Sequence, residues 1–233
     1  KIFKTGIFYK PYLYFNLYYK NKALKKRKTY SQHREDLFID NYFKDTKNGF
    51  YLDIGCYHPI KYSNTALLFN RGWKGINIDM NQTSIDMFNI LRKGDKNICA
   101  AISNESKEAT QYLDHHFSPV NSLEKKFSDT VSKEISFNSH LERKIHTYKF
   151  SQITEAQNIK DTQIDFINID AEAHDFEVLE GIDLNIYKAK LICIEMLDFE
   201  NKINEKKFQH YLTKYNYNLI KIIGPNGIFE LKN

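Results

Sequence analysis

From residue 50 onward, short apolar runs alternate with segments of helical periodicity, and this alternation constrains the fold more than any other feature. The apolar runs are rich in Ile, Phe, Tyr and Leu, as buried strands are. They are Phe50–Ile54, Gly75–Asp79, Asn97–Ile102, Ile164–Asp170, Leu191–Glu195, Leu219–Ile223 and Gly227–Leu231. The helical segments are Asn64–Arg71, Thr83–Arg92, Glu172–Gly181 and Glu200–Tyr215. The pattern predicts βαβ units around a parallel sheet.

The last two runs depart from this pattern, because only Gly224, Pro225 and Asn226 separate them. Three residues are too few for a parallel crossover, so these two strands must be antiparallel neighbours. We therefore expect an α/β, Rossmann-like fold with a seven-stranded, mostly parallel sheet that ends in an antiparallel hairpin. That layout resembles the class I methyltransferases, whereas ordinary dinucleotide dehydrogenases lack the final hairpin.

The chain of 233 residues is long enough for one sizeable core. We predict one domain over residues 30–233, preceded by an N-terminal arm over residues 1–29. Within the domain, residues 103–163 form an unusually long connection in which the stretches ATQYLD and IHTYKF indicate extra strands. A connection of this length usually has a function of its own, so we expect it to cap the substrate site.

No segment reads as a membrane span or a signal peptide, so we expect a cytoplasmic protein. The three cysteines are widely spaced and odd in number, which excludes a disulfide framework. We expect Cys56, Cys99 and Cys193 to be small buried side chains in a reducing compartment.

Positive charge is concentrated in the arm. Residues 1–30 contain nine Lys or Arg and no acid, which leaves 25 basic and 29 acidic residues in the body, a net charge of −4. Such an arm is suited to bind an anionic membrane or glycan surface, which would place the protein at the inner face of a membrane. The alternative is a helix packed on the body, which the spacing of Phe3, Ile7, Tyr14 and Leu17 favours.

The loop after the first strand predicts the type of cofactor. Asp53 lies near the end of this strand and Gly55 begins the turn. A dinucleotide site needs further glycines so that a pyrophosphate can approach the helix, but Tyr57, His58 and Pro59 follow instead. A ligand with adenine, ribose and an amino-acid tail but no phosphate fits better, and S-adenosylmethionine is that ligand.

Asp79 ends the second strand, 24 residues after Gly55. A carboxylate at this place in a doubly wound fold accepts hydrogen bonds from ribose hydroxyls. Its alternative role is helix capping, because Asn81 and Thr83 follow. Small residues at the end of the third strand, Ala101 and Ile102, offer room for an adenine.

Acidic residues gather after the strand that ends at Asp170. A carboxylate at the carboxyl end of a central strand lies in the ligand crevice of this fold. Glu172, His174 and Asp175 follow at a helix start, where acids are ordinary partners of the helix dipole. His174 suits either a general base or a surface histidine.

The sequence resembles the FkbM-type methyltransferases. The similarity lies in "YSQHREDLFIDNYF", "GFYLDIGCYHPIKYSNTALLFNRGWKGINIDM", "AAISNES", "IDFINIDAEAHDFEVLEGI", "LICIEM" and "GIFEL", and spans residues 30–232. It implies methyl transfer from S-adenosylmethionine, commonly to a hydroxyl of a sugar or a natural product. In these stretches Gln32, Cys56, Asn64 and Met80 join the predicted cofactor contacts. The chain departs from the family pattern at Arg34 and Ala173, where glycine is frequent, and the alanine suggests different packing at the helix start.

A sugar hydroxyl is a poor nucleophile and needs assistance from a base or a metal ion. The candidate bases are His58, Asp170 and His174, although His58 equally suits a capping role. A metal ion is not favoured; Mg²⁺ would use Asp170, Glu172 and Glu195. The run Asp114, His115 and His116 lacks zinc-site spacing and is rejected as a metal site.

The predicted acceptor is a hydroxyl of a carbohydrate, such as a surface polysaccharide or a glycan precursor. The alternatives are another acceptor, namely a lipid, a peptide amine or a natural product, and a non-catalytic module that docks through its arm. Nucleic acid is disfavoured, because a body with a net charge of −4 offers no long phosphate-binding groove.

Overall fold

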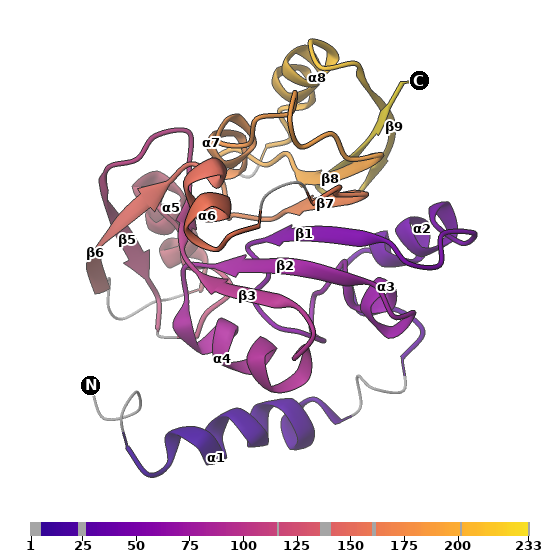
Figure 1. Cartoon of the computed structure of the whole chain (residues 1–233). Coiled ribbons are helices and arrows are strands. Elements are labelled where there is room, and N and C mark those ends of the chain that lie inside the picture. The colour runs from indigo at the N-terminus through magenta and orange to yellow at the C-terminus, as the bar shows by residue number, and fades with distance from the viewer. Residues whose placement is uncertain are drawn as a thin grey trace.

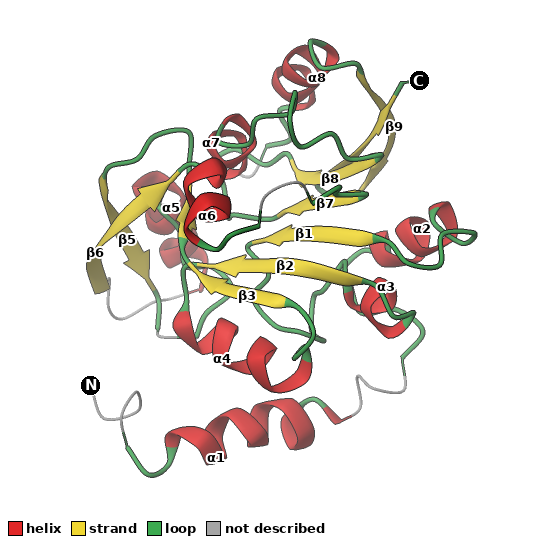
Figure 2. Cartoon of the chain, viewed as in Figure 1, coloured by secondary structure: helices red, strands yellow, loops and turns green. Residues whose placement is uncertain are grey.

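The computed structural model describes residues 6–22, 27–115, 117–135, 141–159, 162–200 and 202–232. Figures 1 and 2 show its elements. The helices are α1 (Tyr9–Tyr14), the π-helical η1 (Phe15–Lys20), α2 (Glu35–Tyr42), α3 (Ala66–Asn70), α4 (Gln82–Leu91), α5 (Lys125–Ile135), α6 (Phe150–Ala156), α7 (Asp175–Glu180) and α8 (Glu205–Thr213). The strands are β1 (Phe50–Ile54), β2 (Lys74–Asp79), β3 (Lys96–Cys99), β4 (Ala101–Ile102), β5 (Glu108–Leu113), β6 (Leu141–Tyr148), β7 (Phe166–Ile169), β8 (Leu191–Glu195), β9 (Tyr217–Ile223) and β10 (Asn226–Leu231).

The central sheet has seven strands in the order β3-β2-β1-β7-β8-β10-β9. In this sheet β3, β2, β1, β7 and β8 are parallel to one another, and β10 is antiparallel to both of its neighbours, β8 and β9. The predicted Rossmann-like fold with a terminal antiparallel hairpin is therefore confirmed. Strand order reverses between β1 and β7, and ligands of this class of sheet bind at such a switch point.

Both faces of the sheet are covered by apolar residues. Along β1, Leu52 belongs to one buried cluster and Tyr51 to another on the opposite face. Neighbouring side chains of a strand point to opposite faces, so a strand buried on both sides reads as a continuous apolar run. This is why the sequence pattern located β1 and β8 at their observed bounds.

The predicted third strand, Asn97–Ile102, is wrong as a single element. It divides into β3 in the central sheet and β4, which joins β5 and β6 in a second sheet of order β4-β6-β5. The extra strands predicted within residues 103–163 are confirmed as β5 and β6. Figure 1 shows β5, β6 and α5 beside the carboxyl ends of β1, β2 and β3.

Three predicted helices are shorter than expected. The first, predicted as Asn64–Arg71, is observed as Ala66–Asn70. The last, predicted as Glu200–Tyr215, is observed as Glu205–Thr213. The helix predicted to begin at Glu172 begins at Asp175, because Glu172 and Ala173 have left-handed φ angles of 54° and 69°.

The arm packs on α4, as Figure 1 shows. Leu13 and Leu17 form an apolar cluster with Met87, and the Tyr9 hydroxyl donates to Asp86 Oδ2 at 2.5 Å. Packing of the arm is thus confirmed, but its predicted inner face is only partly right. Leu17 is buried, whereas Ile7 and Tyr14 are exposed. Phe3 lies outside the described residues.

Cys56 and Cys193 are buried and unpaired, as predicted, but Cys99 is exposed at the end of β3, so its predicted burial is wrong. Within the described residues, no helix has the length and apolar character needed to cross a bilayer.

Candidate active site

The site forms where β1 and β7 end side by side. After β1 the chain turns at Gly55, whose φ angle is +78°. The amides of Gly55 and Cys56 donate to the carbonyl of Ile78, and the Asp170 amide donates to the carbonyl of Ile54. These bonds join the ends of β1, β2 and β7 into one rim, which is the switch-point crevice of the sheet.

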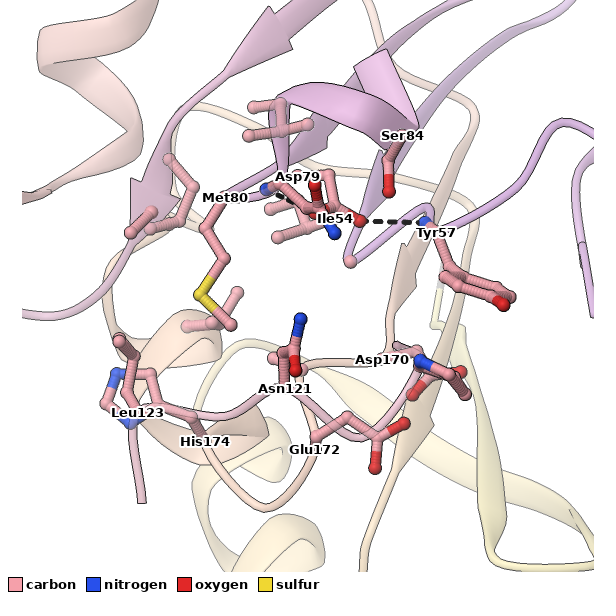
Figure 3. A pocket seen from close by; sticks show the side chains of 18 of the residues that line it. Ile54, Tyr57, Asp79, Met80, Ser84, Asn121, Leu123, Asp170, Glu172 and His174 are labelled. Atoms are coloured by element: carbon pink, nitrogen blue, oxygen red, sulfur yellow. Dashed lines mark hydrogen bonds between the residues drawn. The ribbon is translucent and has the colours of Figure 1, made fainter. Parts of the chain in front are cut away.

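A pocket opens at this rim. The residues of the predicted site that line it are Gln32, Gly55, Asp79, Met80, Ala101, Ile102, Asp170 and His174. Figure 3 shows Asp79 and Met80 on one side of the pocket and Asp170 and Glu172 across from them. Segments far apart in the sequence are thereby brought together around one space of mixed apolar and polar character, as small-molecule sites are.

Asp79 presents a carboxylate to this pocket. Its Oδ2 accepts from the Tyr57 amide at 2.9 Å and its Oδ1 from the Asn81 amide at 2.6 Å. Burial raises the pKa of Asp79 to about 6, and these backbone hydrogen bonds hold it from rising further. Each carboxylate oxygen has two lone pairs, so Asp79 retains acceptor capacity for a ligand hydroxyl.

Asn81 adds an unused donor to the same wall. Its Oδ1 accepts from the Thr83 amide and caps α4, while its buried Nδ2 has no hydrogen-bond partner in the part of the chain that the structure describes. Asn81 lines the pocket. Because buried donors are rarely left unpaired, this amide points to a polar ligand. An apolar wall of Met80, Ala101 and Ile102 lies nearby, which suits an adenine.

Asp53 does not line this pocket. It is buried below the rim, where its carboxylate accepts from the Thr65 hydroxyl at 2.6 Å and from Asn168 Nδ2 at 2.9 Å. Asn64 donates to Asn168 Oδ1 and lines a neighbouring cavity instead. Cys56 packs in a buried cluster with Ile85 and Phe88, two side chains of α4.

His58 also lies away from the pocket and is 1% exposed. Its Nδ1 accepts from the amides of Ile60 and Lys61 at 3.0 Å, and its Nε2 lies 3.2 Å from Asn21 Nδ2. Burial, with the nearby charges of Lys61 and Arg92, lowers the pKa of His58 to about 3. His58 therefore caps a turn within the loop. The predicted capping of the following helix is wrong, because α3 begins only at Ala66 and has no side-chain cap.

Comparison with known protein families matches residues 53–219 to the methyltransferase FkbM domain. The chain belongs to the FkbM family of methyltransferases. No curated protein matches the chain. Family membership makes the protein an S-adenosylmethionine-dependent methyltransferase, and it replaces the alternative of a non-catalytic binding module. The pocket fits this cofactor, since it combines the Asp79 carboxylate, the unpaired Asn81 amide and an apolar wall.

The two departures from the family's glycines have a conformational explanation. Arg34 and Ala173 have φ angles of 70° and 69°, in the left-handed region that glycine adopts without strain. The expected change of packing at Ala173 is thus a matter of backbone conformation, because a Cβ in this region costs about 1–2 kcal/mol.

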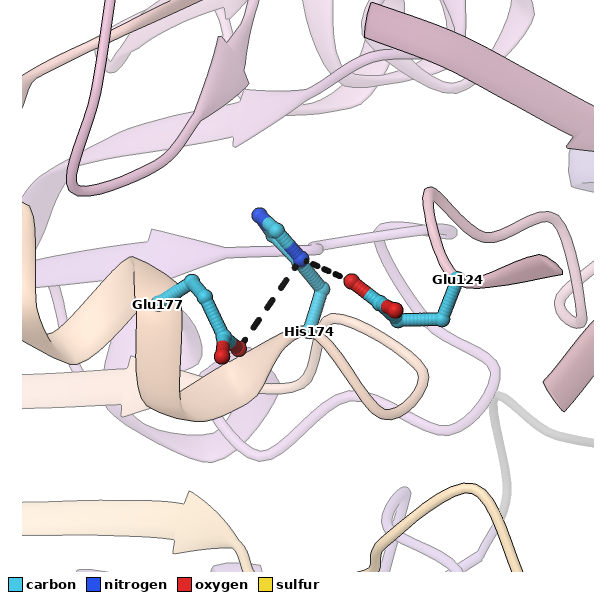
Figure 4. A group of neighbouring side chains, drawn as sticks. All are labelled: Glu124, His174 and Glu177. Carbon is cyan, nitrogen blue, oxygen red and sulfur yellow. Dashed lines mark hydrogen bonds and ion pairs between the residues drawn. The ribbon is translucent and has the colours of Figure 1, made fainter. Parts of the chain in front are cut away.

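His174 lines the methyltransferase pocket with both ring nitrogens engaged. Figure 4 shows its ring beside Glu124 and Glu177. Nδ1 lies 2.8 Å from Glu124 Oε1, and Nε2 lies 3.0 Å from Ser103 Oγ. The hydrogen bond from His174 lowers the pKa of Glu124. These partners orient the ring and connect α7 to residues of the 103–163 connection.

A second cavity adjoins the cofactor pocket. Asp170 and Glu172 line both, and the second also contains Glu35, Asn64 and Glu195. Neither cavity is lined by a lysine or arginine among the described residues. Burial and the neighbouring carboxylate charges raise the pKa of Asp170 to about 7. The same causes raise the pKa of Glu172 and Glu195 well above the usual range.

Sequence reasoning missed several pocket residues. They are chiefly aromatic or come from the long connection: Tyr57, Tyr62, Asn81, Ser84, Ser118, Pro119, Asn121 and Leu123. The connection is held in place by Ser122, whose Oγ donates to the carbonyl of Glu172 at 2.6 Å. Asn81 had a visible capping signal, but no sequence pattern marked the loop at 118–123. In the group that was rejected as a zinc site, His115 Nε2 lies 3.4 Å from Asp114 Oδ2. His116 lies outside the described residues.

Proposed function

We propose that this FkbM-family enzyme methylates a hydroxyl group of a carbohydrate. The observation that carries the proposal is that Asp170 and Glu172 line both the cofactor pocket and the second cavity. An acceptor in that cavity lies next to the cofactor. Carboxylates and amides accept and donate the hydrogen bonds that sugar hydroxyls need, whereas a phosphorylated acceptor would be repelled by the acidic lining.

S-adenosylmethionine supplies an electrophilic methyl group on sulfur, and its transfer to a hydroxyl leaves S-adenosylhomocysteine and releases one proton. The chain must therefore orient the acceptor oxygen and receive its hydrogen bond. Asp170 is the only one of the three predicted catalytic residues that lines both cavities. His174 lines the cofactor pocket alone, and His58 lines neither.

A second acceptor class is favoured by the same acidic lining. A peptide amine carries positive charge, and the carboxylates of Glu35, Asp170 and Glu195 would attract it. Uncharged side chains of the cavity, among them Val120, Phe127 and Leu197, suit the apolar face of a sugar ring equally well. The product separates these candidates, because a methyl ether and a methylamine differ in mass fragments and in basicity.

The test is incubation of the enzyme with methyl-labelled S-adenosylmethionine and either extracted glycan or amine-containing peptides. We expect a labelled methyl ether on a released sugar. Asp170→Asn should lower kcat by about 100-fold while cofactor affinity changes little. His174→Gln should have a smaller effect, because both ring nitrogens already contact protein groups. Label found only on amines would contradict the carbohydrate proposal.

A further inference from the structure

Three carboxylates converge beside the acceptor cavity. Asp170 follows β7, Asp175 begins α7 and Glu195 ends β8. One carboxylate oxygen from each lies within 4.8 Å of the other two. Since β7 and β8 are adjacent and parallel, their carboxyl ends meet at one edge of the sheet. The topology of the fold therefore brings these acids together, and Asp175 reaches them from the helix that follows.

Asp175 is the most buried member of this cluster. Its side chain is buried, with the residue 1% exposed. Oδ1 accepts from the Ala171 amide at 2.6 Å, but among the described residues the buried Oδ2 has no hydrogen-bond partner. A buried carboxylate oxygen without a donor is unfavourable, and more so in a cluster of carboxylates. No lysine or arginine lines the adjoining cavities, in the part of the chain that the structure describes, to offset this charge.

We propose that Asp170, Asp175 and Glu195 bind a hard divalent cation such as Mg²⁺ or Mn²⁺. Carboxylate oxygens are the ligands that these ions prefer, and such ions commonly retain open positions for water or substrate. The sequence favoured no metal and offered Asp170, Glu172 and Glu195 as the alternative set. The geometry exchanges Glu172 for Asp175.

The position of the cluster gives the cation a role, which rests on the proposed function. Asp170 and Glu195 line the acceptor cavity, while Asp175 lines neither cavity. A cation held by these three residues would adjoin the acceptor cavity. Coordination would orient the acceptor oxygen and make its proton easier to lose.

The test measures binding directly. Chelator-treated wild-type enzyme is titrated with Mn²⁺, and free Mn²⁺ is followed by electron paramagnetic resonance. We expect one ion per chain, at least about tenfold weaker binding in Asp175→Asn and Glu195→Gln, and unchanged binding in Glu177→Gln. Glu177 is the matched control, because it belongs to a separate acidic group with Glu124 and His174.

Melting temperatures supply a second readout that does not depend on activity. In chelator, Asp175→Asn should be at least as stable as the wild type, since it removes a buried charge near two other carboxylates while its amide oxygen can still accept from the Ala171 amide. Added Mn²⁺ should raise the melting temperature of the wild type but not of Asp175→Asn. Absence of Mn²⁺ binding by the wild type, or equal binding by both cluster variants, would overturn the proposal.

Turnover in chelator separates this inference from the proposed function. Full carbohydrate methylation in chelator would remove the cation's role and leave the function intact. If the cluster binds the cation but the enzyme methylates no carbohydrate, the cation site stands and the proposed carbohydrate acceptor is contradicted.

A second inference rests on the outer face of the arm. Residues Leu13 and Leu17 face the body, and the opposite side exposes Ile7, Phe8, Tyr14, Phe15, Tyr18 and Tyr19. Exposure reaches 91% at Ile7, 75% at Phe8 and 73% at Tyr19. Lys10, Lys20 and Lys22 are exposed beside them. Helices that lie in a membrane interface combine an apolar, aromatic face with flanking lysines in this way.

We infer that this face docks on an anionic lipid membrane. Charge complementarity selects that occupant, because residues 1–30 contain nine Lys or Arg and no acid. Docking would hold the enzyme at the inner face of a membrane, as the distribution of charge along the sequence predicts.

Sedimentation with phosphatidylcholine vesicles, with and without phosphatidylserine, tests this inference. The wild type should bind the anionic vesicles in low salt. A variant with Lys10, Lys20 and Lys22 changed to Gln should bind about 100-fold more weakly, and so should Phe8→Ser with Tyr19→Ser, at unchanged melting temperature. Equal binding by these variants would overturn the inference. Failure of the wild type to bind either kind of vesicle would also overturn it. So would a wild-type dimer in light scattering that dissociates when Phe8 and Tyr19 are changed.

Discussion

Gly55 has no room for a Cβ, because such an atom would overlap the backbone oxygen of Asp170. The two residues follow neighbouring strands, β1 and β7, and the Asp170 amide donates to the residue before Gly55. Both residues line the cofactor pocket, so this close approach requires glycine at position 55. Further glycines of a dinucleotide site serve a pyrophosphate, which S-adenosylmethionine lacks.

Gly55→Ala should therefore destabilise the fold and abolish cofactor binding. Alanine there meets both a left-handed φ of +78° and an overlap with backbone. Gly72→Ala is the matched control, since Gly72 has a φ of +92° but no atom within 4 Å of its Cβ position. We expect about 1–2 kcal/mol of lost stability in Gly72→Ala and a further 1–3 kcal/mol or so in Gly55→Ala. Urea denaturation measures both, and equal losses would contradict the close approach.

The sequence located this rim but not the role of each acid. Asp53 and Asp79 both stand near the end of an apolar strand, and one-dimensional spacing treats them alike. Their surroundings differ, because the Asp53 carboxylate accepts from the side chains of Thr65 and Asn168 below the sheet's edge, whereas the Asp79 carboxylate accepts from two backbone amides and borders the pocket. The contacts of Asp53 with Thr65 and Asn168, and that of Asp79 with the Tyr57 amide, join residues at least 12 positions apart, so no local pattern contains them.

The apolar runs predicted the strands of the central sheet well, but they wrongly joined β3 and β4 into one strand across Ala100. Both results have the same cause. Burial on both faces gives a strand a signal of its own, but a run does not record where it leaves one sheet for another. Between β3 and β4 the chain leaves the central sheet to pair with β6. The loop at 118–123 carries no periodic signal at all, so its contribution to the pocket appears only in three dimensions.

Asp53→Asn should impair stability and spare cofactor binding. An asparagine accepts one of the two hydrogen bonds from Thr65 and Asn168 but presents an amide to the other donor. We expect a loss of about 2–3 kcal/mol in the free energy of unfolding. Calorimetric affinity for S-adenosylmethionine should stay within about threefold of the wild type. Strong loss of affinity in a stable Asp53→Asn variant would place Asp53 back in the cofactor site.

Because His58 is buried, we expect the free energy of unfolding to fall in acid. Its pKa is about 3 in the folded chain against 6.5 for an ordinary histidine, so protons bind the unfolded state first as the pH falls. Its stabilising contribution is full above pH 6.5 and is lost as the pH falls toward 3. Between pH 7 and pH 4 the titration of His58 should lower the free energy of unfolding by about 3 kcal/mol.

His58→Asn keeps an acceptor for the amides of Ile60 and Lys61 but cannot titrate in this range. Urea denaturation at the two pH values should show a smaller acid-induced loss in the variant than in the wild type. An identical loss in both proteins would mean that His58 is not the buried neutral histidine described here.

The arm contributes to stability through its inner face. Leu17 is fully buried against Met87, so Leu17→Ala should lower the free energy of unfolding by about 2–4 kcal/mol. Tyr19→Ala is the control, because Tyr19 is 73% exposed and should cost less than about 1 kcal/mol. Thermal denaturation compares the two, and similar melting temperatures would show that the arm is not packed on α4.

The assignment of the cofactor pocket rests on Asp79, whose pKa of about 6 also sets a pH dependence. Below that pH the carboxylate is protonated and becomes a poorer acceptor for ribose hydroxyls. The affinity of the wild type for S-adenosylmethionine should therefore fall between about pH 7 and pH 5, roughly one unit to either side of that pKa. In Asp79→Asn this fall should be smaller.

Calorimetric titration of S-adenosylmethionine into the wild type and into Asp79→Ala at neutral pH tests the central claim most directly. The wild type should bind the cofactor, and the folded variant should bind it more weakly by about 1.5–3 kcal/mol, the value of hydrogen bonds to a charged group. Unchanged affinity in Asp79→Ala, or a wild type that binds NADH in preference to S-adenosylmethionine, would contradict the account.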